Sequence, residues 1–236
     1  MPRLLVAHRM DGPVLQRISD ARPPPTPEEI QELVNAVSVQ DVSAGIQQAE
    51  SLLQQGLSLE SVLIDWIAEA ARVLGEQWLS DDKSFAEVTL GMNMLYRISA
   101  LLRHRLKPPP PHRGQVVLLA APGEQHTLGI HILGDLLQHA GWDAVVEPHL
   151  SEDELVAMVS TEPVVMVGIT VSSEQFTGSL GRIVKRVRKA SLNRDVGVLL
   201  GGAVDLSEQA EAIGAVFCPS VQSVVPWLNS HARISI

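Results

Sequence analysis

Two patterns of apolar and polar positions divide the chain. In the first half apolar residues recur at steps of three and four, and in "SLESVLIDWIAEAARVLGEQWL" they place on one helical face Val62, Trp66, Ala70, Val73 and Leu74. In the second half short continuous apolar runs alternate with amphipathic segments. The segment "LKPPPPHRGQ" separates the halves, and its four consecutive prolines favour an extended, semi-rigid spacer.

Helix-capping residues mark the N-terminal ends of two helices in the first half of the chain. Thr26, Pro27 and Glu29 supply an N-cap, a proline at the first helical position and the closing residue of a capping box. Ser84 and Glu87 form a second capping box before "FAEVTLGMNMLYRISALLRHRL". Together with the apolar periodicity, these signals predict a four-helix bundle.

The second half alternates strands and helices. The apolar runs are "QVVLLAA", "DAVVE", "VVMVGIT", "VGVLLGG" and "AVFCP". The helices expected between and after them lie at about 129–140, 151–160, 175–190, 206–213 and 221–229. Continuous apolar strands that alternate with helices are typical of a parallel sheet covered on both faces. Five strands at this spacing favour the doubly wound, flavodoxin-like order.

The predicted fold class is therefore α/β plus all-α, in four segments. We expect an N-terminal tail at 1–25, the four-helix bundle at 26–106, a proline-rich linker at 107–114 and the five-stranded sheet domain at 115–230.

Composition narrows the class of protein. With 45% apolar residues among 236, the chain can bury a sizeable core. Its net charge of −9 argues against direct binding of nucleic acid or of a membrane surface, because both carry negative charge. The single cysteine, Cys218, permits no intrachain disulfide, and the apolar run near the N-terminus is too short for a signal peptide. We therefore expect a cytoplasmic protein without a membrane span.

Polar and glycine residues gather where three of the predicted strands end. Ligands of doubly wound sheets bind outside the carboxyl ends of the strands. The loops at that edge contain Glu124, Gln125, His126, Thr127 and Gly129 after the first strand, Thr170 and Ser172 after the third, and Gly201 and Gly202 after the fourth. Forty residues separate Gly129 from Thr170, and 28 separate Ser172 from Gly201. A neutral imidazole such as that of His126 is a good metal ligand.

This arrangement resembles the cobalamin-binding domain, whose usual pattern is D-x-H-x-x-G, then S-x-L, then G-G. Here the pattern is E-x-H-x-x-G, T-x-S and G-G at nearly the same spacing. The resemblance implies bound cobalamin, as hydroxocobalamin or adenosylcobalamin, with His126 as the lower axial cobalt ligand and Glu124 orienting its ring. It further implies that Thr170 and Ser172 offer hydroxyls to the nucleotide tail. The three motif glycines (Gly129, Gly201 and Gly202) would let that tail approach the backbone.

The resemblance extends into the helical half. The segment "GEQWLSDDKSFAEVTLG" is similar to the Trp-to-Glu segment of the four-helix cap in cobalamin photoreceptors. It implies that Trp78 and Glu87 face the upper axial ligand, and Met92 and Leu95 would lie on the same face. Ordinary core packing is the alternative for Trp78 and Met92. The histidines that accompany these residues in the light-sensing repressors are absent from this segment.

The whole layout resembles the AerR/PpaA group of photosynthesis antirepressors. The resemblance implies a light-responsive regulator that binds a repressor of the CrtJ/PpsR type and has no DNA-binding domain of its own. His8, in the tail, is a hypothetical upper axial ligand, and a tail histidine without a role is the alternative. Arg182, Lys185, Arg186, Arg188 and Lys189 form a basic helical face, either solvated or a docking surface for an acidic partner or DNA.

Two other hypotheses remain at this point. A corrinoid protein that carries methyl groups for a methyltransferase would share the same layout, but it would be expected to keep the aspartate and the leucine of the usual pattern. A sheet domain that has lost its cofactor, or that holds another tetrapyrrole such as haem, is the third. The sequence contains no nucleophile–base pair, P-loop or dinucleotide fingerprint, so we do not expect an enzyme.

Overall fold

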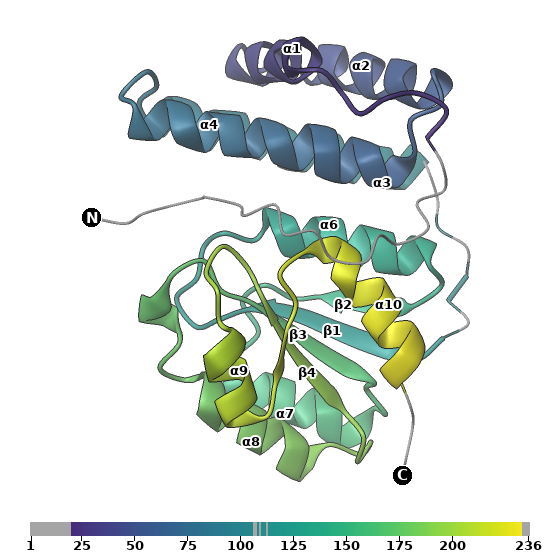
Figure 1. The fold of residues 1–236 in the computed structure, drawn as a ribbon, viewed down its shortest axis with the longest axis vertical. Helices are drawn as coiled ribbons and strands as arrows, with labels where there is room; N and C mark the ends of the chain where they lie inside the picture. Colours follow the sequence, from purple (N-terminus) through teal and green to yellow (C-terminus); the bar gives the residue numbers. More distant parts are fainter. Residues whose placement is uncertain (1–19, 106–107, 109, 112, 233–236) are drawn as a thin grey trace. The chain divides into compact units, whose positions relative to one another are not determined.

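The computed structural model describes residues 20–105, 108, 110–111 and 113–232, and the chain divides into two compact units. One is built from helices and the other from a five-stranded sheet with helices on its faces (Figure 1). This arrangement confirms the predicted fold class.

The helical unit is a four-helix bundle in which the third helix changes its winding. Its elements are α1 (Pro27–Ser38), α2 (Val42–Gln54), α3 (Leu59–Ser61), the π-helical η1 (Val62–Ala68), α4 (Glu69–Leu79) and α5 (Phe85–Arg105), with α3, η1 and α4 continuous. Thr26 caps α1, and both hydrogen bonds of the predicted capping box with Glu29 are present. Ser84 and Glu87 likewise bond to each other's backbone N–H at the start of α5.

Apolar periodicity did not indicate the π-helical stretch of this bundle. Trp66 lies within it and is fully buried, and its indole Nε1 donates to the carbonyl oxygen of Glu29 at 3.1 Å. Of the predicted apolar face, Val62, Ala70 and Leu74 are also fully buried, whereas Val73 is half-buried.

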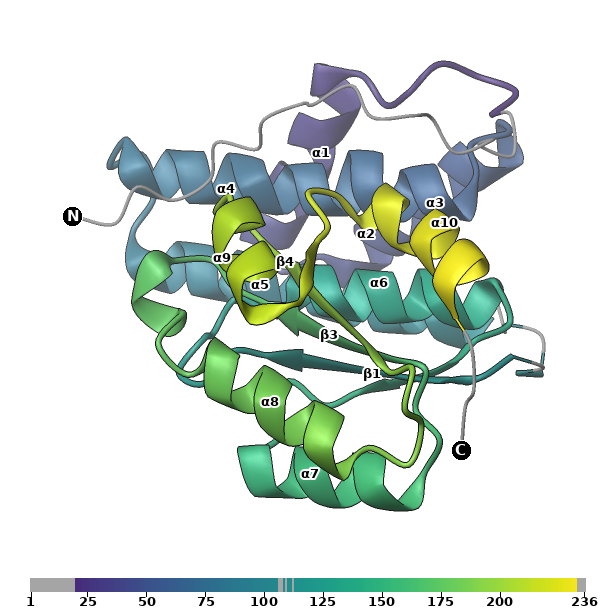
Figure 2. The same ribbon diagram turned by 60° about the horizontal axis from the view of Figure 1, so that its bottom comes forward.

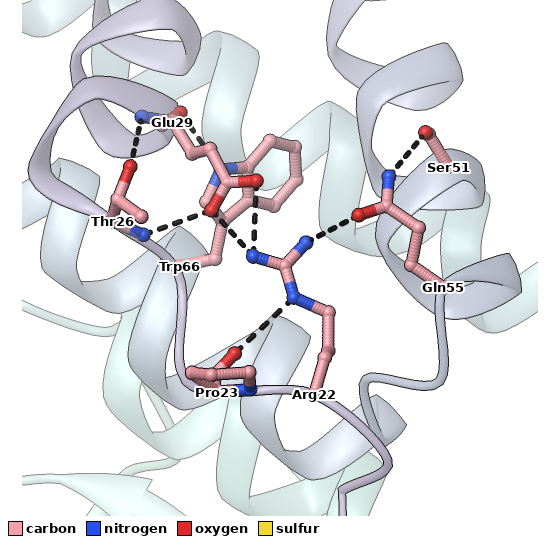
Figure 3. Close-up of polar contacts among 7 residues, drawn as sticks. All are labelled: Arg22, Pro23, Thr26, Glu29, Ser51, Gln55 and Trp66. Carbon is pink, nitrogen blue, oxygen red and sulfur yellow. Dashed lines mark hydrogen bonds and ion pairs between the residues drawn. The ribbon is translucent and has the colours of Figure 1, made fainter.

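Arg22 ties the segment before α1 to the bundle (Figure 3). Its guanidinium donates to both carboxylate oxygens of Glu29, at 2.8 and 3.0 Å, and to the side-chain oxygen of Gln55 at 2.7 Å. The same Glu29 closes the capping box with Thr26 and accepts from Trp66 through its backbone. One arginine therefore links the start of α1 to the end of α2.

Asp20 makes a second attachment for the same segment. Its carboxylate accepts from the backbone N–H of Ser58 at 2.5 Å and from the hydroxyl of Ser61 at 2.6 Å. The N–H of Ala21 donates to the carbonyl oxygen of Gly56 at 2.8 Å. Residues 20–25 therefore belong to the helical unit, and the expected tail boundary after residue 25 lies too late in the chain.

Replacing Arg22 with alanine should lower the free energy of unfolding of the helical unit by about 1–2 kcal/mol at pH 7, since charge-assisted bonds of a mostly buried guanidinium are lost. Hydrogen bonding to Arg22 lowers the pKa of Glu29 below its ordinary value of 4.5. This stabilisation is therefore complete above that pH and is lost as the pH falls through the lowered, folded-state value.

Urea unfolding followed by circular dichroism measures the effect at several pH values. The control is Glu32→Ala, at an exposed position of α1. It should change the unfolding free energy by less than about 0.5 kcal/mol. If Arg22→Ala and wild type had the same free energy of unfolding at pH 7, the bonds of Arg22 would contribute nothing to the stability of the helical unit.

The sheet unit has the strand order β2-β1-β3-β4-β5, all parallel, which is the predicted flavodoxin-like order. The strands are β1 (Gln115–Ala120), β2 (Asp143–Val146), β3 (Met166–Thr170), β4 (Gly197–Gly201) and β5 (Val216–Phe217). The α-helices are α6 (Leu128–His139), α7 (Glu152–Thr161), α8 (Leu180–Ala190), α9 (Ser207–Ile213) and α10 (Val221–His231). No helix in the described part of the chain is both long and apolar enough to cross a membrane.

Successive side chains of the strands enter two separate cores. Val117 and Leu119 of β1 pack with α7, α8 and α9, whereas Val116 and Leu118 pack with α6 and α10. Figure 2 shows α7 and α8 on one side of the sheet and α6 and α10 on the other. This alternation explains the continuous apolar runs in the sequence, because both faces of the sheet are covered.

Two expectations for this unit need correction. The helix expected at 175–190 is broken: a single 3-10 turn, η2 (Glu174–Phe176), precedes α8, which begins only at Leu180. Arg113, assigned to the linker, is bound to the sheet unit, since its N–H donates to Gly141 at 3.1 Å and its guanidinium lies 5.1 Å from the ring centre of Trp142.

The basic face of α8 is partly neutralised within the unit. Arg182 pairs with Glu152 at 2.9 Å, and Arg186 pairs with Glu152 at 3.1 Å and Asp153 at 2.7 Å. Both acidic residues lie in the first turn of α7. Two of the five basic residues of this face are thus paired with acidic residues of the sheet unit.

Candidate cofactor-binding site

His126 lies in the loop between β1 and α6, and a buried carboxylate holds its ring. Its Nδ1 lies 2.7 Å from Oε1 of Glu124, whose side chain is fully buried, whereas the His126 side chain is 56% exposed. With Nδ1 protonated and donating to the carboxylate, the lone pair of the ring lies on Nε2. The loop therefore presents one oriented imidazole nitrogen to an external ligand.

Glu124 accepts hydrogen bonds from two loops. Its Oε1 accepts from the N–H groups of Gln125 and His126, both at 2.8 Å, and its Oε2 accepts from the N–H of Ser172 at 2.6 Å and from the Ser172 hydroxyl. Burial alone would raise the pKa of Glu124, but the bonds from Ser172 and His126 together lower that pKa to about 2. The side chain is therefore an anion throughout the neutral range.

Ser172 has a different role from the one expected. Its hydroxyl was expected to face a nucleotide tail, but it is buried, bonds to Glu124 and lies 3.0 Å from Nδ1 of His126. The loop after β3 is thereby joined to the loop after β1. In this way the structure brings together Glu124, His126 and Ser172.

A cavity of about 220 Å³ lies at the carboxyl edge of the sheet, and four of the predicted residues line it: Gly129, Thr170, Gly201 and Gly202. Strand register explains why they meet, since Thr170 pairs with Gly201. The rest of the lining includes Leu118, Leu133, Met166, Cys218, Pro219, Ser220, Val221 and Val224.

Sequence reasoning missed the loop between β5 and α10, which forms part of this cavity. Cys218 and Ser220 come from it, and Val221 and Val224 follow in the first turn of α10. The fifth strand ends at the same edge as the others, so the rule that ligands bind at carboxyl ends could have identified this loop. Its residues carry no recognisable motif, and only topology points to them.

The glycines of the cavity serve different purposes. A Cβ added at Gly129 would meet no atom within 4 Å, so this glycine keeps space open. Gly202 has a φ of +137°, and a Cβ there would lie 2.0 Å from the carbonyl oxygen of Val171. Gly202 is therefore required by the close approach of two backbone segments rather than by a ligand.

The other predicted residues lie apart from this cavity. Gln125 is exposed, and Thr127 is buried at the N-cap position of α6 without a side-chain capping bond. His8 lies outside the described residues.

Three predicted residues belong to the helical unit. Trp78 packs edge-on against Phe85, with ring centres 6.4 Å apart, and Met92 is half-buried. Glu87 is exposed, and its carboxylate accepts from the hydroxyl of Ser84 at 2.7 Å. Leu95 was expected to share their face but is fully buried in the core of the bundle.

No group of three or more histidine, cysteine, aspartate or glutamate side chains within the described residues is arranged to hold a metal ion. Other histidines have local bonds: Nδ1 of His139 lies 2.9 Å from the carbonyl oxygen of Asp135, and His231 stacks on Trp227. His126 differs from them because its partner is the buried carboxylate of Glu124.

Comparisons with known proteins find a matching family model and two similar relatives. The family model for the B12 binding domain matches residues 114–220. The "Uncharacterized 20.5 kDa protein in bchF-crtJ intergenic region" of Rhodobacter capsulatus is 31% identical over 160 residues, which are 66% of this chain and 81% of that protein. Monomethylamine corrinoid protein 1 of Methanosarcina acetivorans is 21% identical over 199 residues, which are 80% of this chain and 89% of that protein.

A solved structure shares the fold. The Methanosarcina barkeri monomethylamine corrinoid protein superposes with a TM-score of 0.72 at 15% identity, covering 87% of this chain and 99% of that one. At this identity the likeness shows the fold alone.

Proposed function

This chain belongs to the family of the Rhodobacter capsulatus protein of the bchF-crtJ intergenic region and contains a B12 binding domain, and from that premise we propose that it is a cobalamin-binding, light-responsive regulator of transcription. It acts by binding a repressor of the CrtJ/PpsR type and has no specific DNA binding of its own. The observation that supports cofactor binding most strongly is the exposed His126 ring held by buried Glu124 in the loop between β1 and α6.

The residues at the sheet edge fit cobalamin. His126 would hold the cobalt of bound cobalamin, because it offers one oriented imidazole nitrogen. Glu124 keeps the proton on Nδ1 and so leaves Nε2 free for the metal. When bound, cobalamin would supply light-sensitive chemistry at its cobalt. Gly129 leaves the adjoining cavity open to the nucleotide tail.

The regulatory role is supported by the relative's gene position, which its name places between bchF and crtJ. The substitution of glutamate for the usual aspartate in E-x-H-x-x-G points the same way. As a regulator the chain would need no catalytic activity. His8 remains our candidate for a ligand that takes the upper position after illumination.

The alternative function is a corrinoid protein that carries methyl groups for a methyltransferase. The corrinoid protein of Methanosarcina acetivorans favours it by sequence, over 80% of this chain. The two functions differ in what the bound cobalt must do, because a methyl carrier must pass through Co(I), whereas the regulator needs a stable form that responds to light.

Binding to a purified CrtJ-type repressor tests the regulatory role. We expect the cobalamin-loaded protein to bind it with affinities that differ between darkness and illumination, and His126→Ala to remove that difference. Identical affinities in the dark, in the light and without cobalamin would contradict the proposal. Demethylation of the methylcobalamin-loaded protein by a methyltransferase would favour the alternative.

A further inference from the structure

A groove with basic side chains lies at the opposite end of β4 from the cavity described above. Its volume is about 630 Å³, and its lining includes Arg188, Arg194, Gly197, Trp227, Ser230 and His231. Gly197 begins β4, whereas Gly201, which lines the other cavity, ends it. Figure 1 shows the last turn of α10 at the edge of the sheet where the strands begin. This basic groove is therefore a separate site.

Two arginines of the basic groove keep donors that the fold does not use. Within the part of the chain that the structure describes, neither Arg188 nor Arg194 forms an ion pair, unlike Arg182 earlier on α8. Arg188 donates to the carbonyl oxygen of Gly214, which uses one of its five N–H groups. Arg194 is exposed, and the groove also contains the exposed carboxylate of Asp195. Two guanidinium groups therefore exceed one carboxylate, and the groove favours an anionic ligand.

A stacked pair of rings lines the same groove. The rings of Trp227 and His231 have centres 4.8 Å apart and lie 9° from parallel. Nδ1 of His231 lies 3.0 Å from the carbonyl oxygen of Trp227, which holds the imidazole in place. A Cβ at Gly197 would lie 2.3 Å from the indole, so the glycine makes room for Trp227. Both rings are thus positioned before a ligand binds, which lowers the entropic cost of binding.

The groove matches an acidic peptide segment better than a phosphate ligand. Nucleic acids bind through many neutralised phosphates, whereas this groove offers two arginines on a chain with a net charge of −9. One face of the Trp227 indole is covered by His231, so a nucleotide base cannot stack there. A single phosphate would leave most of the volume unfilled. Arginine and tryptophan, by contrast, are the side chains that dominate binding energy in protein interfaces.

We propose that the basic groove binds a segment of a partner protein that carries glutamate or aspartate side chains. The carboxylates of the segment pair with Arg188 and Arg194, because a guanidinium matches a carboxylate with two parallel hydrogen bonds. The apolar parts of the segment lie against Trp227 and His231. Binding here requires neither cobalamin nor light, so this proposal and the function proposed above can fail independently.

Fluorescence anisotropy with a labelled peptide tests the proposal. The probe is a short fluorescein-labelled peptide of alternating glutamate and glycine, and the control peptide has glutamine in place of every glutamate. We expect the full-length protein to bind the glutamate peptide at least about tenfold more tightly than the glutamine peptide. Equal affinity for the two peptides, or no binding of the glutamate peptide, overturns the proposal. Tighter binding of a labelled single-stranded oligonucleotide or of adenosine monophosphate overturns it as well.

Three variants assign the binding to the groove. Arg188→Gln and Arg194→Gln should each weaken binding of the glutamate peptide by about tenfold, because each removes charge-assisted hydrogen bonds. Arg194 is the sharper test, since among the described residues its side chain forms no bond that the fold would lose. Lys185→Gln, the matched control, removes the same charge from an exposed position of α8 outside the groove and should change the affinity by less than about twofold. Unchanged affinity in Arg194→Gln, or an equal loss in Lys185→Gln, would contradict the assignment.

Discussion

Glu124→Ala is expected to weaken cobalamin binding by about 10- to 100-fold, the usual cost of removing the partner of a metal-bound histidine. The ring of His126 loses the acceptor that fixes its orientation. The backbone N–H groups of Gln125, His126 and Ser172 lose their shared acceptor, so the free energy of unfolding of the sheet unit should also fall by about 3 kcal/mol. Spectral titration and urea unfolding measure the two effects.

Two further variants separate these effects. Glu124→Gln keeps the size of the side chain but turns part of the acceptor into a donor, so it should weaken binding nearly as much as alanine does. Glu174→Ala removes an exposed carboxylate from the loop after β3 and should change neither quantity. If Glu124→Ala bound cobalamin as tightly as wild type does, the carboxylate would not be needed to hold His126 as a cobalt ligand.

Gly202→Ala is expected to destabilise the sheet unit by on the order of 3 kcal/mol, since backbone strain and overpacking each cost about 1–3 kcal/mol. The φ of +137° is unfavourable for alanine, and its Cβ would lie 2.0 Å from the carbonyl oxygen of Val171. Loops after β3 and β4 would have to separate, so cobalamin binding should be lost together with stability. Chemical unfolding of the apoprotein measures the first effect directly.

Gly178→Ala is the comparison for this prediction. A Cβ at Gly178 meets no atom within 4 Å, so the unfolding free energy should stay within about 0.5 kcal/mol of wild type. If Gly202→Ala were as stable as Gly178→Ala, the close approach to Val171 would not exist in solution.

Most of the fold could be predicted because local signals and packing agree. Five continuous apolar runs separated by amphipathic helices leave little choice besides a parallel sheet covered on both faces. Neither the π-helical turn around Trp66 nor the attachment of Asp20 and Arg22 could be predicted from a local pattern. Asp20 bonds to Ser58 and Arg22 to Gln55, which lie 38 and 33 residues further along the chain.

The motif residues of the site could be predicted, but their contacts only in part. The resemblance to the cobalamin-binding domain implied a bond between Glu124 and His126, which the structure contains. That Ser172 is turned toward Glu124 follows from the way in which β1 and β3 lie side by side, which a pattern of single residues does not encode. The apolar cavity wall from α10 could not be distinguished in sequence from ordinary core.

Absorption spectroscopy with and without light tests the central claim most directly. Wild type and His126→Ala are each mixed with hydroxocobalamin or adenosylcobalamin, freed of unbound cofactor, and measured in darkness and after illumination. We predict stable binding to wild type, a spectrum of histidine-ligated cobalt that is lost in His126→Ala, and a light-driven change to a second stable form. Absence of bound cofactor, or a spectrum unaffected by His126→Ala, would contradict the assignment of His126 as the cobalt ligand.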